Sequence, residues 1–195
     1  MISFLEHKEI DKHKWNHCLE SSINARIYAY SWYLDIVSSN WGALIEDDYK
    51  YIFPIPSQKN LGISYITQPL FTQQLGLFSS DKEYDVGLFI KAIPKRFWIR
   101  SLQIHNQWKK NRTKDNFELD ISDNIEEIRK KYSKNVKRNF KKAVEYNLEI
   151  KVCSNNSLIK LFKENKGKEV PELNRKSYSI LVELLNKIQQ KEKGD

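Results

Sequence analysis

The sequence predicts a mixed α/β fold in which helices flank a sheet. Short segments of alternating apolar and polar residues are interleaved with segments whose apolar residues recur at helical spacing. The composition fits such a fold, because 40% of the residues are hydrophobic while Gly (6) and Pro (5) are scarce. With 195 residues, the chain has the length of one domain or of one and a half.

The first 121 residues contain most of the expected strands. Asp47 and Asp48 separate two apolar segments, which predicts a hairpin with the two aspartates in its turn. In chain order we expect a helix at 8–20, a strand at 26–30, a helix at 31–37, strands at 41–46, 49–55 and 62–67, a loop at 68–77, a helix at 82–93, and strands at 96–105 and 116–121.

A long basic helix is expected at residues 122–146. Apolar residues at helical spacing form one of its faces: Ile125, Ile128, Tyr132, Val136, Phe140 and Val144. Ser122 and Asp123 are expected to cap its start, and Asn147 to end it in a left-handed conformation. Residues 148–152 then alternate as a strand would.

Two amphipathic helices follow, at 154–167 and from residue 171 onward, and no strand is expected after them. Helices with one apolar face need a surface to cover. They either fold back on the first domain or open a second domain that is cut short, and we favour the second interpretation. We therefore divide the chain into a domain at 1–145 and the beginning of a second, similar domain at 146–195.

Charge is unevenly distributed along the chain, whose formal net charge is +8. Residues 1–120 contain 15 basic and 14 acidic side chains, whereas residues 121–195 contain 18 and 11. The second part therefore predicts an anionic partner: nucleic acid, a phosphorylated substrate or a membrane surface. A merely solvated helix face explains the same pattern equally well. The candidate anion-binding residues are Lys134, Lys137, Arg138, Lys141 and Lys142.

Several patterns bear on location and metal binding. No apolar segment approaches the ~20 residues that span a membrane, and the N-terminal sequence lacks the pattern of a secretory signal. Cys18 and Cys153 do not require a disulfide, so we expect a cytoplasmic location. His13 and His17 have the spacing of metal ligands on a helix, but no carboxylate accompanies them, and no metal site is predicted. No obligate protein partner is evident.

Four stretches of the chain resemble the FemAB-like peptidyltransferases, which set two N-acetyltransferase-like (GNAT-like) domains in tandem. They are Trp15 in the first helix, 31–37 followed by 41–45, 63–70, and 132–143 followed by 147–150. In the last stretch a Lys- and Arg-rich helix ends at an asparagine and leads into a strand, as in the family. The resemblance covers the whole chain as the front part of a longer family member, and it implies a GNAT-like mixed sheet.

The resemblance implies transfer of an acyl or aminoacyl group to an amine, with tRNA or an acyl-CoA as donor. It also implies that the loop of Thr67, Gln68 and Pro69 borders the substrate cleft. An acyl-CoA pyrophosphate needs a turn of small residues at a helix start. The nearest match, at 73–78, places Phe78 at the last position, so we expect this turn to lie in the core and predict no cofactor in this chain.

The expected function is that of the substrate-positioning N-terminal part of an acyltransferase-related protein. No catalytic residue is identified, because the sequence has no Ser-His-Asp, Cys-His or phosphate-loop motif. Activity is not expected from this chain alone. The alternative function is that of a non-catalytic basic module that binds nucleic acid, such as tRNA, or another anionic ligand such as a nucleotide-linked small molecule.

Overall fold

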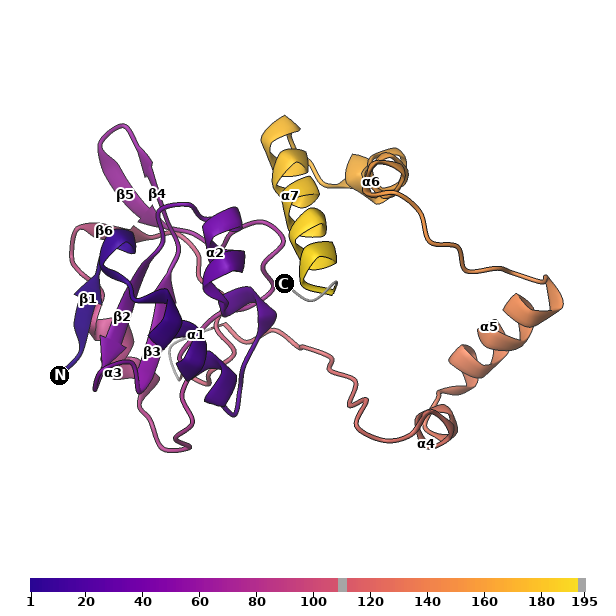
Figure 1. Cartoon of the computed structure of the whole chain (residues 1–195), viewed down its shortest axis with the longest axis horizontal. Helices are drawn as coiled ribbons and strands as arrows, with labels where there is room; N and C mark the ends of the chain where they lie inside the picture. The colour runs from indigo at the N-terminus through magenta and orange to yellow at the C-terminus, as the bar shows by residue number, and fades with distance from the viewer. Residues whose placement is uncertain (109–111, 193–195) are drawn as a thin grey trace. The chain divides into compact units, whose positions relative to one another are not determined.

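The computed structural model describes residues 1–108 and 112–192, which form a mixed α+β protein with two three-stranded sheets and seven α-helices (Figure 1). Its internal contacts define two compact units. One unit comprises Met1–Lys109 and Asn155–Asp195, and the other comprises Lys110–Ser154.

Most elements belong to the first unit. In chain order they are β1 (Ser3–Leu5), the 3-10 helix η1 (His7–Glu9), α1 (Lys12–Ser21), η2 (Ile27–Ala29), α2 (Ser31–Val37), β2 (Gly42–Glu46), β3 (Tyr51–Ile55), β4 (Ser57–Asn60), β5 (Ile63–Ile66), α3 (Val86–Ala92), β6 (Phe97–Ile99), α6 (Asn155–Glu164), η3 (Lys166–Glu169) and α7 (Arg175–Glu192). The second unit contains α4 (Ile125–Lys130) and α5 (Lys134–Glu145).

The first sheet has the order β1-β2-β3 and is antiparallel throughout. Its strands β2 and β3 form the predicted hairpin, in which Glu46 pairs with Tyr51. Asp47 and Asp48 in the turn both have a φ of 51°, a left-handed conformation that Asp adopts more readily than most residues. Turn geometry therefore explains the two aspartates, as the sequence predicted.

The second sheet has the order β4-β5-β6, with β4 and β5 antiparallel and β5 and β6 parallel. Leu61 and Gly62, with φ of 48° and 81°, form the turn between β4 and β5, since both central positions of such a tight turn need a positive φ. The strand expected at 96–105 is reduced to β6, because the chain beyond it leaves β5. Ile104 then meets Leu75 in a single isolated bridge.

An aromatic core stabilises the first unit. The side chains of Trp15 and Trp41 are completely buried, and their ring centroids lie 4.8 Å apart. Trp15 Nε1 donates a hydrogen bond to the carbonyl oxygen of Ala29 at 2.8 Å, so the buried indole leaves no polar atom unsatisfied. Trp41 Nε1 likewise donates to Asp35 Oδ1 at 3.0 Å, so this indole pair combines large apolar area with a hydrogen bond for each N–H group.

The C-terminal helix α7 packs on α2 within the first unit. Leu184 of α7 is 3% exposed and lies in one apolar cluster with Tyr33 and Val37 of α2. This contact agrees with the alternative in the sequence analysis in which the last helices fold back on the first domain. A second, similar domain beginning at residue 146 stays a prediction.

The expected single basic helix is two helices, so that prediction was wrong. α4 ends at Lys130 and α5 begins at Lys134. Between them, Ser133 has an extended backbone and its Oγ accepts a hydrogen bond from the Val136 amide at 3.3 Å, which makes it an N-cap. Periodicity does not reveal this break, because the apolar spacing continues across it.

Three of the expected strands are absent from the described residues. Residues 26–30 contain η2 instead, while 116–121 and 148–152 run without strand pairing. The last two segments alternate apolar and polar residues, but no neighbouring strand supplies the ladder hydrogen bonds that would make them strands. Asn147 does end α5 in a left-handed conformation, with a φ of 50°, as predicted.

Two helices begin later than expected because their caps lie elsewhere. Asp85 accepts a hydrogen bond from the Gly87 amide at 2.7 Å and caps α3, which therefore starts at Val86. Asn124 caps α4 by accepting from the Glu127 amide at 3.1 Å, in place of the predicted Ser122 and Asp123. Asp and Asn are strong N-caps in either position, so sequence spacing did not distinguish them.

Candidate anion-binding site

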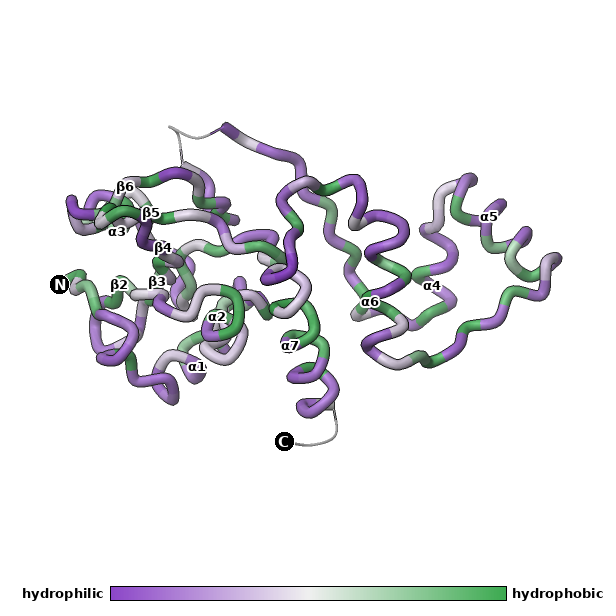
Figure 2. Tube along the Cα trace, turned by 90° about the horizontal axis from the view of Figure 1, so that it is seen from above, coloured by the Kyte–Doolittle hydropathy of each residue, from purple (hydrophilic) through white to green (hydrophobic). Residues whose placement is uncertain are grey.

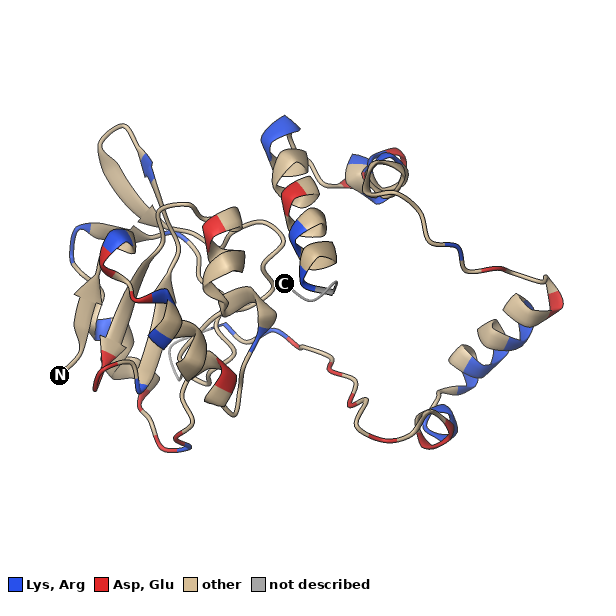
Figure 3. Ribbon diagram, viewed as in Figure 1, with Lys and Arg blue, Asp and Glu red and all other residues tan. Residues whose placement is uncertain are grey.

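The candidate site is the basic face of α5, which we define by five exposed side chains. They are Lys134, Lys137, Arg138, Lys141 and Lys142. With about 100° between successive residues of an α-helix, these positions fall within an arc of roughly 140°. Figure 3 shows the concentration of cations along this helix. The helix, set by the Ser133 cap and the Asn147 stop, therefore gathers the predicted cations on one side.

Most cations of the basic face have no acidic partner. Among the described residues, only Lys141 has a carboxylate within reach, Glu145 Oε1 at 3.8 Å. Lys137 Nζ donates to the backbone oxygen of Lys130 at 3.2 Å, a bond that neutralises no charge. Since residues 129–142 contain eight Lys and Arg and no Asp or Glu, the local potential is positive.

The neighbouring cations of α4 differ, because each is paired with an acid. The pairs are Arg129–Glu126 at 3.0 Å, Lys130–Glu127 at 2.6 Å and Lys131–Asp123 at 2.5 Å. Exposed pairs of this kind stabilise a protein little, but they lower the charge that a ligand meets. The basic face of α5 is therefore where an external anion can supply the missing countercharge.

The loop that the sequence assigned to a substrate cleft is held to the protein by its own hydrogen bonds. Gln68 Nε2 donates to the carbonyl oxygen of Thr72 at 2.9 Å, and Gln68 Oε1 accepts from the Gln103 amide at 2.9 Å. Pro69 is buried and Thr67 is half-buried. The structure fixes the shape of this loop, and its role beside a substrate stays a prediction.

The turn at residues 73–78 lies in the core, as the sequence predicted. The side chains of Leu75, Leu77 and Phe78 are completely buried. Their backbone amides donate to acceptors within the protein at 2.8 Å, 2.8 Å and 2.9 Å respectively. These three amides are used in hydrogen bonds within the protein, whereas the amides of a pyrophosphate-binding turn point at the ligand.

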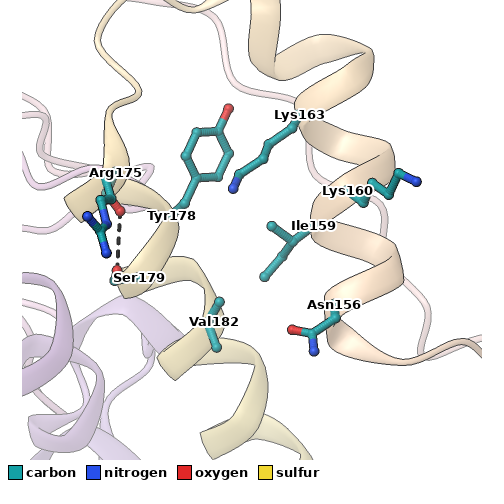
Figure 4. Close-up of a pocket in the computed structure, with 8 residues that line it drawn as sticks. All are labelled: Asn156, Ile159, Lys160, Lys163, Arg175, Tyr178, Ser179 and Val182. Carbon is teal, nitrogen blue, oxygen red and sulfur yellow. Dashed lines mark hydrogen bonds between the residues drawn. The ribbon is translucent and has the colours of Figure 1, made fainter.

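A hollow of about 420 Å³ lies between α6 and α7 (Figure 4). It is lined by Asn156, Ile159, Lys160, Lys163, Arg175, Tyr178, Ser179 and Val182. Lys163 Nζ lies 4.4 Å from the centroid of the Tyr178 ring, a cation–π contact. In Figure 4 the side chain of Lys160 points away from Tyr178. The polar groups of the hollow therefore do not converge on one point, as they do in a ligand pocket.

A charged cluster that the sequence did not predict centres on Asp35 of α2. The Asp35 carboxylate accepts hydrogen bonds from Lys12 Nζ at 2.8 Å and Trp41 Nε1 at 3.0 Å, and lies 2.8 Å from His7 Nε2. Burial by itself raises the pKa of Asp35, but these three hydrogen bonds outweigh it and the pKa is lowered. The cluster connects separate segments of the chain to α2. Its members are not close enough in sequence to form a recognisable motif.

The histidine pair of α1 does not assemble a metal centre. His13 and His17 are exposed, whereas the neighbouring Cys18 is buried, and burial raises the pKa of its thiol. In the part of the chain that the structure describes, no three His, Cys, Asp or Glu side chains come together to hold a metal.

Comparison of the chain with protein family models, with curated proteins and with solved structures finds no match. No helix among residues 1–108 and 112–192 is both long and apolar enough to cross a membrane.

Proposed function

We propose that this protein binds a phosphate-bearing partner through the basic face of α5. The observation that supports it is the set of five exposed cations on one side of a twelve-residue helix, of which one alone among the described residues has an acidic partner. Lysine and arginine contacts to phosphates bind without reading sequence, and they draw their free energy from counterion release. The partner classes are nucleic acid, tRNA among them, nucleotide-linked small molecules and the phosphates of a membrane surface.

Arg138 has a distinct role on this face. Its guanidinium presents several donors in a fixed plane and can hold a phosphate through two hydrogen bonds, whereas each lysine acts as a point charge. Arg138 now donates to Asn135 Oδ1 at 2.7 Å, a neutral acceptor that a phosphate can replace. We expect Arg138 to orient the bound phosphate and the lysines to raise its affinity.

A second proposed function is that of an acyltransferase-related protein with a GNAT-like fold, in which this chain positions a substrate. It is supported by the resemblance to the FemAB-like group. It is also supported by the order of elements along the chain, in which α2 is followed by the β2–β3 hairpin and then by the loop after β5, which contains Thr67, Gln68 and Pro69. Transfer would then depend on holding donor and acceptor together rather than on a covalent intermediate. No catalytic residue is assigned.

Charge reversal on α5 tests the first proposal. Lys137→Glu with Arg138→Glu removes two cations of the basic face, and we expect affinity for total tRNA to fall at least about tenfold. The magnitude of the slope of log K against log salt should also fall, by about 0.7–0.9 for each lost phosphate contact. Fluorescence anisotropy with labelled tRNA at several salt concentrations measures both quantities.

The matched control reverses two exposed lysines of the first unit, Lys91→Glu with Lys95→Glu, and changes the net charge by the same amount. Equal weakening in both double variants would show that net charge alone attracts the tRNA. Unchanged binding in the α5 variant would mean that the basic face does not contact tRNA and is solvated in that complex. Formation of an amide on an amine acceptor, followed by mass spectrometry with aminoacyl-tRNA or acyl-CoA as donor, tests the transferase proposal separately.

A further inference from the structure

The side of α5 opposite its basic face is apolar, and the rest of its own unit leaves it exposed. Val136, Phe140 and Val144, which we call the apolar face, are 43%, 54% and 60% exposed. Figure 2 shows hydrophobic and hydrophilic residues following one another along this helix. Successive members of the apolar face lie four residues apart, so they stand one above the other on the helix. A water-exposed stripe of this kind on a regular, capped helix needs an apolar partner.

The segments on both sides of the two helices also expose apolar side chains. In the second unit, the large apolar and aromatic side chains that are exposed among the described residues are Phe117, Leu119, Ile121, Ile125, Val136, Phe140, Val144, Tyr146, Leu148, Ile150 and Val152. Ile128 is buried. One buried aliphatic side chain does not form a core, so this unit exposes most of the apolar area that a folded domain would hide.

Cations border the apolar face directly. Lys137 is the helix neighbour of Val144 on one side, and the Arg129 guanidinium lies 5.7 Å from the centroid of the Phe140 ring. Long basic side chains can lay their methylene groups along an apolar surface and extend their charges to phosphates at its edge. The second unit therefore presents an apolar stripe with a positive border.

We propose that this stripe docks on an anionic lipid surface, with α5 lying in the plane of the headgroups. The proposal rests on the proposed function, because the lipid phosphates would be the phosphate-bearing partner of the basic face. Helices that bind in this way have a charged face rich in Lys and Arg and an apolar face that contains aromatic residues, while polar residues predominate over the helix as a whole. Each lysine or arginine near such a surface strengthens binding by about fivefold.

The aromatic residues fit this orientation. Phe140 lies at the centre of the stripe, and Tyr146 is 74% exposed just after the helix end. Tyr146 follows Lys142 by four residues and therefore lies beside the basic face, where a tyrosine can meet the headgroup region of a bilayer. The apolar face would enter the boundary between headgroups and acyl chains, with Phe140 at its centre.

Charge argues against a second copy of this chain as the occupant. Pairing two apolar faces would bring two copies of residues 129–142 together, each with eight cations and no acidic residue. Repulsion between them would oppose such a dimer. An anionic surface instead gains from the same charges.

The two faces together also favour lipid over nucleic acid. No aromatic side chain lies between the five cations of the basic face, and Tyr146 borders it only beside Lys142, so the face has no series of rings on which successive bases could stack. A nucleic acid would contact the basic face and leave Val136, Phe140 and Val144 in water. A lipid surface satisfies both faces of the helix at once.

Vesicle sedimentation with the full chain tests the proposal. The probes are vesicles of phosphatidylcholine containing 30% phosphatidylglycerol, vesicles of phosphatidylcholine alone, and total tRNA, all in 0.1 M salt. We expect strong binding to the mixed vesicles and little to phosphatidylcholine alone. Phe140→Gln with Val144→Gln keeps good helix formers on the helix, and it should weaken vesicle binding at least about tenfold while leaving tRNA binding unchanged.

Two controls make the outcomes separable. Leu161→Gln on α6 removes an apolar side chain that is 60% exposed in the first unit, and it should leave vesicle binding unchanged. Circular dichroism checks that each variant keeps its helices. Vesicle binding that survives the Gln double variant would overturn docking through the apolar face. Binding to tRNA without binding to vesicles would overturn the lipid proposal and leave the proposed function standing, and binding to neither would overturn both.

Discussion

Replacing Leu184 with alanine tests whether the C-terminal helix stabilises the first unit. Leu184 is 3% exposed and packs against Tyr33 and Val37 of α2. The sequence left open whether this helix folds back on the first domain or belongs to another one. If α7 is part of the first unit, truncating Leu184 removes apolar contacts from that unit and lowers its free energy of unfolding.

The expected magnitude follows from the burial of this side chain. Replacing a buried Leu by Ala costs about 2–5 kcal/mol, and the cost is lowest where the neighbouring side chains can close over the cavity. The cluster around Leu184 is small and bordered by partly buried residues such as Phe71 and Ile180, which can move inward. We therefore expect a loss of about 2–3 kcal/mol.

Tryptophan fluorescence during urea unfolding measures this loss in the right place. All five tryptophans lie within residues 1–108, so the signal reports on the part of the first unit that lies outside α7. With a slope of about 2 kcal/mol/M, the midpoint should fall by about 1–1.5 M. Leu161→Ala, the same chemical change at an exposed position of α6, should change the free energy of unfolding by less than about 0.5 kcal/mol.

The reasoning is refuted if the midpoint of the Leu184→Ala variant equals that of the unchanged protein. That result would mean that α7 does not stabilise α2, and it would favour the separate domain at 146–195 that the sequence predicted. A midpoint lowered equally by Leu161→Ala would point to a general effect on the C-terminal helices rather than to the Leu184 cluster.

Three further predictions concern the first unit. Asp35→Ala removes the acceptor of the buried Trp41 Nε1, and urea unfolding should show a loss of about 1–3 kcal/mol. The hydrogen bond from Lys50 lowers the pKa of Asp81 to about 2. The ionised Asp81 carboxylate therefore stabilises the fold above the unfolded pKa of about 3.9, and this stabilisation is lost as the pH falls from there towards 2. Asp81→Asn should flatten that part of the stability–pH curve. Gly76 has a φ of 132°, and a Cβ there would collide with a neighbouring side chain, so Gly76→Ala should lower the thermal midpoint, with a cost of about 1–3 kcal/mol.

Each of these predictions has a control and a result that contradicts it. Lys12→Ala removes an exposed partner of Asp35 and should cost under about 1 kcal/mol; a larger effect than that of Asp35→Ala would show that the indole bond is not the important one. If the fall in stability below about pH 4 is unchanged in Asp81→Asn, the Asp81 carboxyl is not its cause. Gly62 also has a positive φ, but no atom lies near a Cβ built on it, so Gly62→Ala should cost less than Gly76→Ala.

Local chemistry made several elements predictable from the sequence. The hairpin turn at Asp47 and Asp48 depends on residues that adopt left-handed backbone conformations, and α2 depends on a short run of helical spacing. The shared face of the five α5 cations follows from helical geometry once a helix is assumed. Asn147 was likewise identified as the helix stop, because asparagine adopts the left-handed conformation that ends many helices.

Other features could not be predicted because they depend on partners that are distant in the sequence. The segment 148–152 has the alternation of a strand, but a strand exists only where another strand pairs with it. The cluster at Asp35 joins side chains from separate elements, and nothing in the local sequence of any one of them indicates the others. The break at Ser133 is local, yet the apolar periodicity that continues across it concealed the cap.

The sequence by itself determined the charge asymmetry, the turns, the caps available to each helix and the amphipathic pattern of α5. These depend on residue type and on spacings of a few residues, which set backbone preference and helix faces without reference to the rest of the chain. The tertiary structure decided which segments became strands and where α7 packs. Those outcomes depend on hydrogen-bond and apolar partners that folding brings together from distant parts of the chain.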